Sequence, residues 1–536
     1  MNVLVATLIV AASVTTNDVG EALGKLISAQ PDAAPRLIEK IVEADPGADA
    51  ILAAFEDGIA PRPEEARRAK VVAGWSAWTA TDTAGVSRPY QLYVPRAIAE
   101  GARPKALLVH LHGAVGRSDY GTGLGTPNAT GYASLLWPDL AEREGIVVAT
   151  PLGRADCMWW TDPGVRHVRA VVRDVRRGLA IPERSVFASG FSDGASGCYY
   201  LAMTGPDPFA GFLAMNGHPA VAASSPGKQL YLRNLTASSI IAAMTQEDSL
   251  YPSRTVLPHL QIAIGFGASV HVLSYPSMNH QPSYFKEQQS LITRFLSSNE
   301  RSTPSRLVWL TSDVELGRAR WLEILELGKT ASDRDALTPS NVPSEPGRVR
   351  LGVSLDGATS TLASIREGSL ASSLGLRVGD EVQQINADRI TSSTELRQAL
   401  RSLTYGGHIA LAVRRDGERI VVQGTVPDFT PEPIYQRERD TAHVDITIQH
   451  DGSGEEAPPI VKVDTHGVRR LRVWLPNVAR LHDEAFVTIN GKNRDVPIRT
   501  RSTVELLRAL HEHGHTDAAR ICYLEIEVPS TPTEAR

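Results

Sequence analysis

The chain has 536 residues, of which 42% are hydrophobic and 21% charged, and its formal net charge is −5. This length exceeds what one hydrophobic core normally serves, so we expect several globular domains. There is no Lys/Arg block and the aromatic content is 6%, which argues against a protein built around nucleic acid or an anionic membrane surface. The three cysteines are too few and too scattered for a disulfide scaffold or a zinc site, and the sequence leaves open whether Cys157 and Cys198 are bridged.

The first residues, MNVLVATLIVAASV, are apolar and end in small side chains. Such a segment is too short to span a bilayer and is typical of a secretory signal. We therefore predict a signal peptide at residues 1–16 and export to the periplasm or the extracellular space. The alternative is a buried N-terminal helix in a cytoplasmic protein. No later segment is long and apolar enough for stable membrane insertion.

Residues 17–70 carry apolar side chains at helical spacing, such as Val19, Leu23 and Leu26, and prolines interrupt the pattern. This predicts two or three short helices. The sequence leaves open whether they form a cap over a functional site or pack against the sheet that follows.

From Gly74 onward the pattern changes to strands. GWSAWTATDTAGVSRPYQLYVP predicts an antiparallel hairpin, and helix-length segments then alternate with the apolar runs ALLVHLHG, IVVATP, SVFASGFS, FAGFLAMNG, SIIAAMT and VHVLSYP. Continuous apolar strands that alternate with helices are typical of a mostly parallel sheet covered on both faces. Residues 71–300 are therefore predicted to form a doubly wound α/β domain.

Residues 190–194, GFSDG, match the G-x-S-x-G pattern, directly after the strand SVFAS and before a helix rich in small residues. In a nucleophile elbow, flanking glycines make room for a strained turn that raises the serine at the carboxyl end of the strand. The N-terminus of the following helix favours developing negative charge. Ser192 is therefore the predicted nucleophile; the alternative is an ordinary strand–turn–helix with a chance serine.

A chain order of serine, acid and histidine then locates the partners of Ser192. Asp248 lies in the loop QEDSLYP after the strand SIIAAMT and is the predicted acid, with Glu247 as its competitor. His280 lies in the loop PSMNHQPS after the next strand and is the predicted base. Two other histidines fit less well: His271 lies inside a strand, and His218 precedes the acid and is expected at most to line the pocket.

An oxyanion hole needs two backbone donors aimed at the tetrahedral oxygen. The amide of Asp193, directly after the nucleophile, is the first candidate. The second is expected from the loop after ALLVHLHG, where His112-Gly113-Ala114 resembles an HG-type motif and offers the amide of Gly113 or Ala114.

Together these residues resemble the α/β-hydrolase superfamily, over about Gly74 to Ser297. Within it, the segments LHGAVGRS, GFSDGA and CMWW look like polyhydroxybutyrate-depolymerase and feruloyl-esterase-like enzymes, or phospholipase/carboxylesterase relatives. The resemblance implies a carboxylic ester hydrolase that works through an acyl-enzyme without metal or cofactor. Its substrate would be an ester-containing small molecule or polymer.

Residues 301–347 are predicted to be a β-hairpin, from the runs RLVWLTSD and RARWLEILELG, followed by the linker TPSNVPSEPG. Residues 348–427 resemble a PDZ domain of the bacterial, circularly permuted kind, on the segments LGVSL, IREGSLASSLGLRVGDEVQQINADRI and SSTELRQALRS. The resemblance implies a groove that takes a peptide C-terminus by strand addition, with the backbone of Leu351, Gly352 and Val353 holding its carboxylate. A merely structural role of this domain is the alternative.

Residues 428–536 contain the runs HVDITIQ, RLRVWLP, FVTING and CYLEIEV and predict a small, mainly-β domain. The strands of 306–328 would join it if the PDZ-like segment were inserted between them. The leading hypothesis is an exported serine esterase with a docking module. The alternatives are a serine peptidase of the same fold, similar to prolyl oligopeptidase, and a non-catalytic interaction protein on a decayed hydrolase fold.

Overall fold

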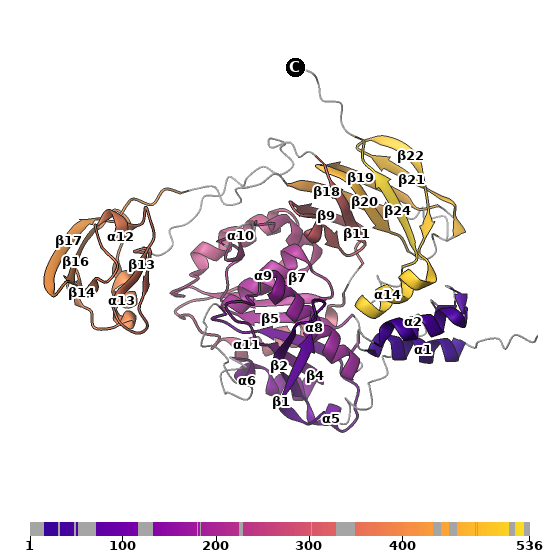
Figure 1. The fold of residues 1–536 in the computed structure, drawn as a ribbon, viewed down its shortest axis with the longest axis horizontal. Coiled ribbons are helices and arrows are strands. Elements are labelled where there is room, and N and C mark those ends of the chain that lie inside the picture. The colour runs from indigo at the N-terminus through magenta and orange to yellow at the C-terminus, as the bar shows by residue number, and fades with distance from the viewer. Residues whose placement is uncertain are drawn as a thin grey trace, which may run out of the picture.

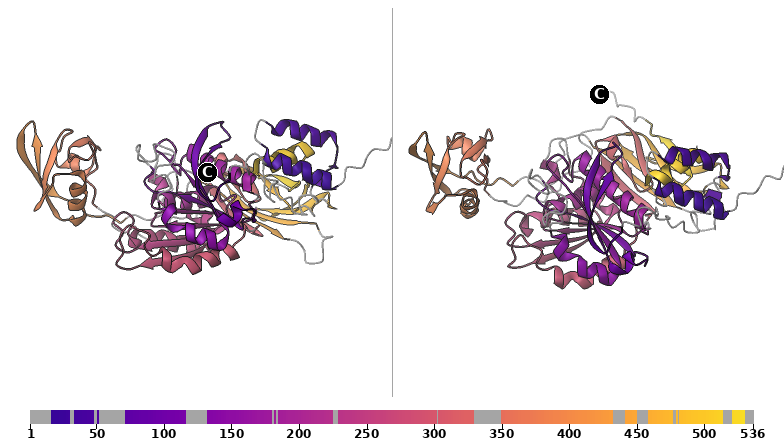
Figure 2. Two further views of the ribbon diagram at one scale, coloured as in Figure 1. Left: turned by 90° about the horizontal axis from the view of Figure 1, so that it is seen from below. Right: turned by 60° about the horizontal axis from the view of Figure 1, so that its bottom comes forward.

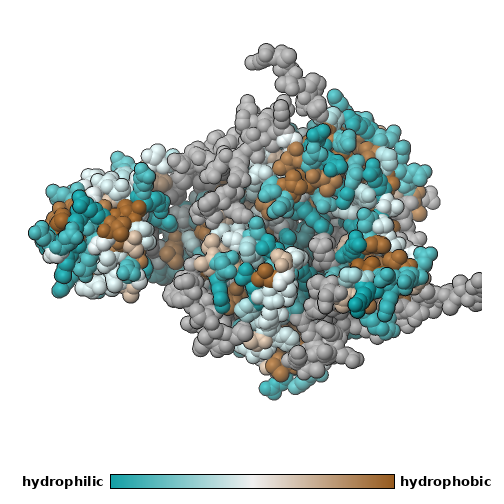
Figure 3. Space-filling view, in the orientation of Figure 1, coloured by the Kyte–Doolittle hydropathy of each residue, from teal (hydrophilic) through white to brown (hydrophobic). Residues whose placement is uncertain are grey.

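The computed structural model contains an α/β domain, a small α+β domain and a β-rich domain with helices packed at one end (Figure 1). In the space-filling view, hydrophobic patches are small and are separated by hydrophilic surface (Figure 3). Within the described part of the chain, no helix is both long enough and apolar enough to cross a membrane. The structure describes residues 16–29, 33–47, 50–51, 71–115, 132–179, 181–182, 184–224, 229–301, 303–328, 349–431, 441–449, 458–476, 479, 481–513 and 520–529.

The α/β domain is built on an eight-stranded sheet with the order β1-β2-β4-β3-β5-β6-β7-β8. The pairs β1–β2 and β2–β4 are antiparallel, and all other neighbours are parallel. Every residue of β3 to β6 is buried, which is why these strands are continuous apolar runs in the sequence. The strands are β1 (Gly74–Thr81), β2 (Ser87–Val94), β3 (Ala106–Leu111), β4 (Ile146–Pro151), β5 (Val186–Phe191), β6 (Gly211–Met215), β7 (Ser239–Thr245) and β8 (Ser269–Tyr275).

Helices cover both faces of this sheet, as predicted. One face packs in a core with α8, α9 and α10, and the other face packs in a second core with α6, α7 and α11. The helical segments of this domain are α5 (Arg96–Ala99), α6 (Ala133–Leu136), α7 (Pro138–Glu144), α8 (Asp162–Leu179), α9 (Asp193–Thr204), η2 (Ala222–Ser224), η3 (Leu232–Ala237), α10 (Ser253–Gly265) and α11 (Phe285–Ser298).

The β-rich domain is a sandwich of two five-stranded sheets, with the orders β10-β11-β20-β24-β23 and β22-β21-β19-β18-β9. Its strands before the α+β domain are β9 (Arg306–Thr311), β10 (Arg318–Ala319) and β11 (Leu322–Leu327). The strands after it are β18 (Ala442–Gln449), β19 (Ile460–His466), β20 (Val468–Trp474), β21 (Glu484–Ile489), β22 (Lys492–Pro497), β23 (Arg499–Thr500) and β24 (Cys522–Glu527).

The hairpin predicted within 301–347 is wrong. β9 pairs with β18 and β11 pairs with β20, so the two strands lie in opposite sheets. The partner of β9 is β18 and the partner of β11 is β20, and both of these distant strands are longer than β9 and β11 themselves. The sandwich therefore does not begin at residue 428: it takes strands from both sides of the α+β domain, which is inserted between β11 and β18.

The N-terminal helices α1 (Thr16–Ser28) and α2 (Ala34–Glu43) neither cover the catalytic face nor pack against the central sheet as their main partner. They lie beside α14 (Thr503–His513) at the end of the sandwich (Figure 2). Leu23 and Ile38 share a buried cluster with Leu506 and Leu510, because each amphipathic helix buries its apolar stripe against this end of the chain. The predicted signal segment, apart from Thr16, and residues 52–70 lie outside the described residues.

The sandwich is joined to the α/β domain by buried polar contacts. The backbone N–H of Leu310 in β9 donates to Asn234 at 2.8 Å, and the Asn234 amide donates back to the Leu310 carbonyl at 2.9 Å. Asp207 accepts from Arg320 at 3.0 Å and from Arg301 at 3.3 Å, and both arginines are 3% exposed. Burial alone would raise the pKa of Asp207, but the two guanidinium groups hold it well below its usual value.

The α+β domain has a core of its own, which includes Leu351, Val382, Leu396 and Leu411. Its strands form a two-stranded sheet, β12-β13, and a four-stranded sheet, β15-β14-β16-β17. The elements are β12 (Val353–Leu355), β13 (Leu362–Ile365), α12 (Leu370–Ser373), β14 (Glu381–Ile385), β15 (Asp388–Arg389), α13 (Ser393–Ala399), η6 (Leu400–Ser402), β16 (His408–Arg415) and β17 (Glu418–Thr425).

Candidate active site

Ser192 lies on the sharp turn between β5 and α9. Its backbone has φ 59° and ψ −123°, a conformation that side-chain-bearing residues rarely adopt and that costs about 1–3 kcal/mol. The turn needs both flanking glycines. A Cβ on Gly190 would lie 2.2 Å from the backbone of Gly194, and a Cβ on Gly194 would lie 1.8 Å from the Leu111 carbonyl oxygen. The sequence therefore stores strain at this serine and holds its hydroxyl at the carboxyl end of the sheet.

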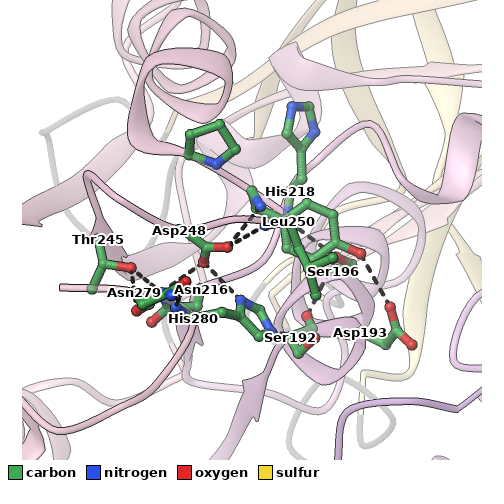
Figure 4. A network of polar contacts seen from close by, with 12 residues as sticks. Ser192, Asp193, Ser196, Asn216, His218, Thr245, Asp248, Leu250, Asn279 and His280 are labelled. Carbon is green, nitrogen blue, oxygen red and sulfur yellow. Dashed lines mark hydrogen bonds and ion pairs between the residues drawn. The ribbon is translucent and has the colours of Figure 1, made fainter. Parts of the chain in front are cut away.

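The structure brings the three predicted triad residues together (Figure 4). His280 Nε2 lies 2.9 Å from Ser192 Oγ, and His280 Nδ1 lies 2.7 Å from Asp248 Oδ2. A neutral imidazole that donates from Nδ1 to the carboxylate leaves Nε2 free to accept the serine proton. The three side chains come from the loops after β5, β7 and β8, three strands that end at the same edge of the sheet.

Asp248 is buried, with 3% of its surface exposed, and each of its oxygens has partners. Oδ1 accepts from the amides of Leu250 at 2.7 Å and Tyr251 at 2.8 Å. Oδ2 accepts from His280 and, at 2.9 Å, from the Asn216 amide. Burial would raise the pKa of Asp248, but these hydrogen bonds keep it below its usual value, so the carboxylate stays charged beside the imidazole.

Asn216 is a site residue that the sequence reasoning missed. It follows β6 with φ 52°, and its Nδ2 also donates to Thr245 Oγ1 at 2.6 Å. Its Oδ1 accepts from the buried Tyr284 hydroxyl, and Thr245 Oγ1 donates to the carbonyl of Asn279, next to His280, at 2.9 Å. The available signal was its place in MNGHP, after the strand next to the one that carries the nucleophile.

The predicted oxyanion segment lies against the nucleophile. A Cβ on Gly113 would be 2.9 Å from Ser192 Cβ, and Ala114 has φ 54°, which turns the chain sharply at this point. The Val115 amide donates to Asp193 Oδ2 at 3.1 Å. The side chain of Asp193 thus ties the 113–115 segment to the turn that carries Ser192.

Tyr251 joins the acid loop to this same carboxylate. Its hydroxyl donates to Asp193 Oδ1 at 3.2 Å, while its amide holds Asp248 and its ring stands edge-on to His280 with centroids 5.9 Å apart. Burial, with the charge of Asp193 beside it, raises the pKa of Tyr251 well above its usual value, so the hydroxyl remains a donor. Tyr251 was not among the site residues predicted from the sequence.

The competing candidates are placed elsewhere. Glu247 and His271 are exposed. His218 is half-buried, and its ring nitrogens contact the Thr255 carbonyl oxygen at 3.0 Å and the Ala220 amide at 3.0 Å. Burial lowers the pKa of His218 to about 4, so it is a neutral residue of the pocket wall.

Cys157 and Cys198 are both buried and are not bridged. Burial raises the pKa of the Cys157 thiol to about 11 and that of the Cys198 thiol further still. Neither is therefore activated as a nucleophile.

The predicted carboxylate-binding segment of the α+β domain precedes β12. Gly352 has φ 80°, and a Cβ there would lie 2.3 Å from Ser369 Cβ, so the site requires glycine. The carbonyls of Leu351 and Gly352 accept from the amides of Ala371 and Arg366, at 2.9 and 2.8 Å, and are thereby turned away from the open edge of β12.

The strand order 1-2-4-3-5-6-7-8, the strained serine after β5, and partners after β7 and β8 decide the fold. Residues 71–301 have the α/β-hydrolase fold. Residues 349–424 match the family model described as PDZ domain, which confirms the resemblance to a PDZ domain. Among curated proteins, none matches the chain significantly.

Solved structures with which the chain aligns include a thermostable esterase, with 21% identity, 42% of this chain, 63% of that chain and a TM-score of 0.34. An S-formylglutathione hydrolase from Staphylococcus aureus has 14% identity over 42% of this chain and 97% of its own, with a TM-score of 0.32. Pyrococcus horikoshii acylaminoacyl peptidase has 12% identity over 44% of this chain and 43% of its own, with a TM-score of 0.33. The chain thus spans less than two thirds of the esterase and less than half of the peptidase.

Proposed function

We propose that this protein is a serine hydrolase that cleaves carboxylic esters, with Ser192 as nucleophile, His280 as general base and Asp248 as the acid. The observation that carries the proposal is the continuous chain of hydrogen bonds from Ser192 through His280 to Asp248, on a serine with φ 59°. A triad is recognised by this geometry and by the roles it allows, rather than by sequence position.

In the proposed reaction Ser192 Oγ attacks the ester carbonyl carbon while His280 Nε2 takes the hydroxyl proton. The carbonyl π electrons move to oxygen, and the amides of Asp193 and of Gly113 or Ala114 stabilise this oxyanion. Collapse of the tetrahedral intermediate breaks the bond to the alkoxy oxygen, which leaves as an alcohol with the proton from His280. Water, deprotonated by His280, then releases the acid from the acyl-enzyme. No step needs a metal or cofactor.

The PDZ domain is proposed to dock a peptide C-terminus, with the backbone of Leu351, Gly352 and Val353 around the carboxylate. The left-handed glycine and the two carbonyls turned away from the groove support this role. Such a module also suits peptide substrates, so a serine peptidase of the same fold is the second candidate activity.

Covalent labelling by a fluorophosphonate, combined with turnover of short p-nitrophenyl esters and of chromogenic peptides, tests the proposal. We expect labelling and ester turnover by the intact chain, and loss of both in Ser192→Ala. Ser196→Ala is the matched control, because that hydroxyl lies one helical turn further along α9 and bonds to backbone. Peptide turnover far above ester turnover would favour the peptidase, and no labelling would contradict both.

We also propose that the protein is exported, on the apolar residues that precede α1. Mass spectrometry of natively produced protein should give an N-terminus between Val14 and Asn17. A mature chain that retains Met1 would make the segment part of the folded protein.

A further inference from the structure

The PDZ domain and the hydrolase domain share one cavity of about 1220 Å³. On the PDZ side it is the groove between β12 and α13, with Leu351, Leu396 and Leu400 among its apolar walls. On the hydrolase side it is lined by the loop after Asp248, including Leu250 and Tyr251. The groove that would take a peptide therefore opens beside the loop that positions the triad acid.

Among the described residues, no strand pairs with the edge of β12 that borders this groove. β12 has one strand neighbour among the described residues, β13, with Val353 opposite Ile365 and Ser354 opposite Ser364. Gly352 uses its carbonyl on the β13 side, where it accepts from Arg366. Because backbone groups alternate between the two edges of an antiparallel strand, those of Val353 point into the groove.

The charge of the groove is one-sided. Four arginines, and no aspartate or glutamate, are found among the described residues that line the cavity; they are Arg350, Arg366, Arg397 and Arg401. All four are exposed, and within the described part of the chain none is in an ion pair. Two carboxylates of this domain have partners of their own: Asp380 pairs with Arg415, and Glu395 of α13 accepts from Thr391.

From this charge pattern we propose that the PDZ groove selects a polypeptide with an acidic C-terminal segment. The segment adds to β12 as a strand, its terminal carboxylate lies at Leu351–Val353, and its acidic side chains face the arginines. Arg350 and Tyr251 line the same cavity, so the docked chain end is held next to the acid loop of the active site. The inference rests on the proposed docking role of the PDZ domain and specifies its partner.

Fluorescence anisotropy on full-length Ser192→Ala protein tests the proposal, because binding is then measured without turnover. The probes are a short labelled peptide with an acidic tail and an apolar last residue, the same peptide with lysines in place of the acids, and the acidic peptide with an amidated C-terminus. We expect the acidic peptide with the free carboxylate to bind at least about ten-fold tighter than either control, and to weaken as salt is raised.

Arg397→Gln combined with Arg401→Gln should weaken binding of the acidic peptide about three- to ten-fold, since exposed ion pairs are individually modest. The control is Arg419→Gln, an exposed arginine of β17 that contacts Gln384 and does not line the cavity. Equal binding of the acidic and lysine peptides would overturn the acidic selectivity, and equal binding of the amidated peptide would overturn carboxylate capture. Failure of every peptide to bind would overturn the proposal, whatever the esterase assay of the unmutated chain gives.

Discussion

Replacing Asp248 by Asn tests the triad most sharply, because the surroundings dictate how the new amide must point. Oδ1 of Asp248 receives two backbone N–H groups, from Leu250 and Tyr251. The amide oxygen of Asn must therefore take this position, which leaves its NH₂ group facing Asn216 Nδ2 and His280 Nδ1. His280 can then bond the new side chain only as an acceptor. Its proton moves to Nε2, and the nitrogen facing Ser192 loses its lone pair for general-base catalysis.

We expect kcat for a p-nitrophenyl ester to fall about 10³–10⁴-fold, a barrier increase of about 4–5.5 kcal/mol. KM should change little, because Asp248 is separated from Ser192 by His280 and does not face the substrate. The fold should persist, since the substitution conserves shape, and circular dichroism of the variant checks this.

The matched control is Glu247→Gln, the neighbouring exposed carboxylate that the sequence offered as a competitor. It should leave kcat unchanged within about two-fold, because a solvated loop side chain contributes little. If Asp248→Asn kept more than about a tenth of the activity, or if Glu247→Gln lost as much as Asp248→Asn, the assignment of the acid would be wrong.

Three further outcomes are expected. Tyr251→Phe removes the hydroxyl that donates to Asp193 but keeps the backbone amide that donates to Asp248. The kcat should therefore fall about ten-fold with little change in KM. An unchanged kcat would show that this hydrogen bond does not hold the oxyanion segment. Asp207→Asn removes the charge opposite two buried arginines and should lower the free energy of unfolding by about 3 kcal/mol at neutral pH, as measured in urea. Because the folded pKa of Asp207 is depressed, its contribution is complete above the unfolded pKa of about 4 and is lost as the pH falls through the folded value. The deficit of the variant should therefore shrink below about pH 4, and a deficit independent of pH would refute the ion-pair explanation. In a further variant, residues 329–440 are excised and the ends are joined by a flexible linker. Turnover of a small ester should stay within about three-fold of that of the intact chain, since the triad lies outside the excised segment. If the variant folds and its turnover falls by orders of magnitude, the PDZ domain is coupled to the chemistry itself.

The hydrolase domain could be predicted from the sequence because its signals are local. Buried parallel strands are continuous apolar runs, and the elbow at Ser192 needs two glycines at fixed spacing, since a Cβ on either would overlap backbone. The positions of Asp248 and His280 then follow from chain order along the same edge of the sheet.

The features that could not be predicted from the sequence depend on contacts between distant segments. β9 and β11 read as a hairpin because they are neighbours, yet their partners lie more than a hundred residues further on, beyond the inserted domain. The N-terminal helices meet α14 in the same way, with His511 contacting the carbonyl of Ala29. Asn216 and Tyr251 were missed because their importance comes from the atoms they hold, Asp248 and Asp193, and not from a motif.

The sandwich and the PDZ domain that is inserted into it relate differently to the hydrolase domain. Removing everything after residue 297 would take away β9, whose Leu310 lies in the hydrolase core and bonds Asn234, and would leave Asp207 without Arg301 and Arg320. The sandwich is thus part of what stabilises the hydrolase, whereas the PDZ domain, with its own core, is attached through two chain segments. A domain held at both ends samples a smaller volume than one held at a single end. A ligand bound in the groove as proposed would therefore be kept at a high effective concentration beside the loop that carries Asp248 and Tyr251.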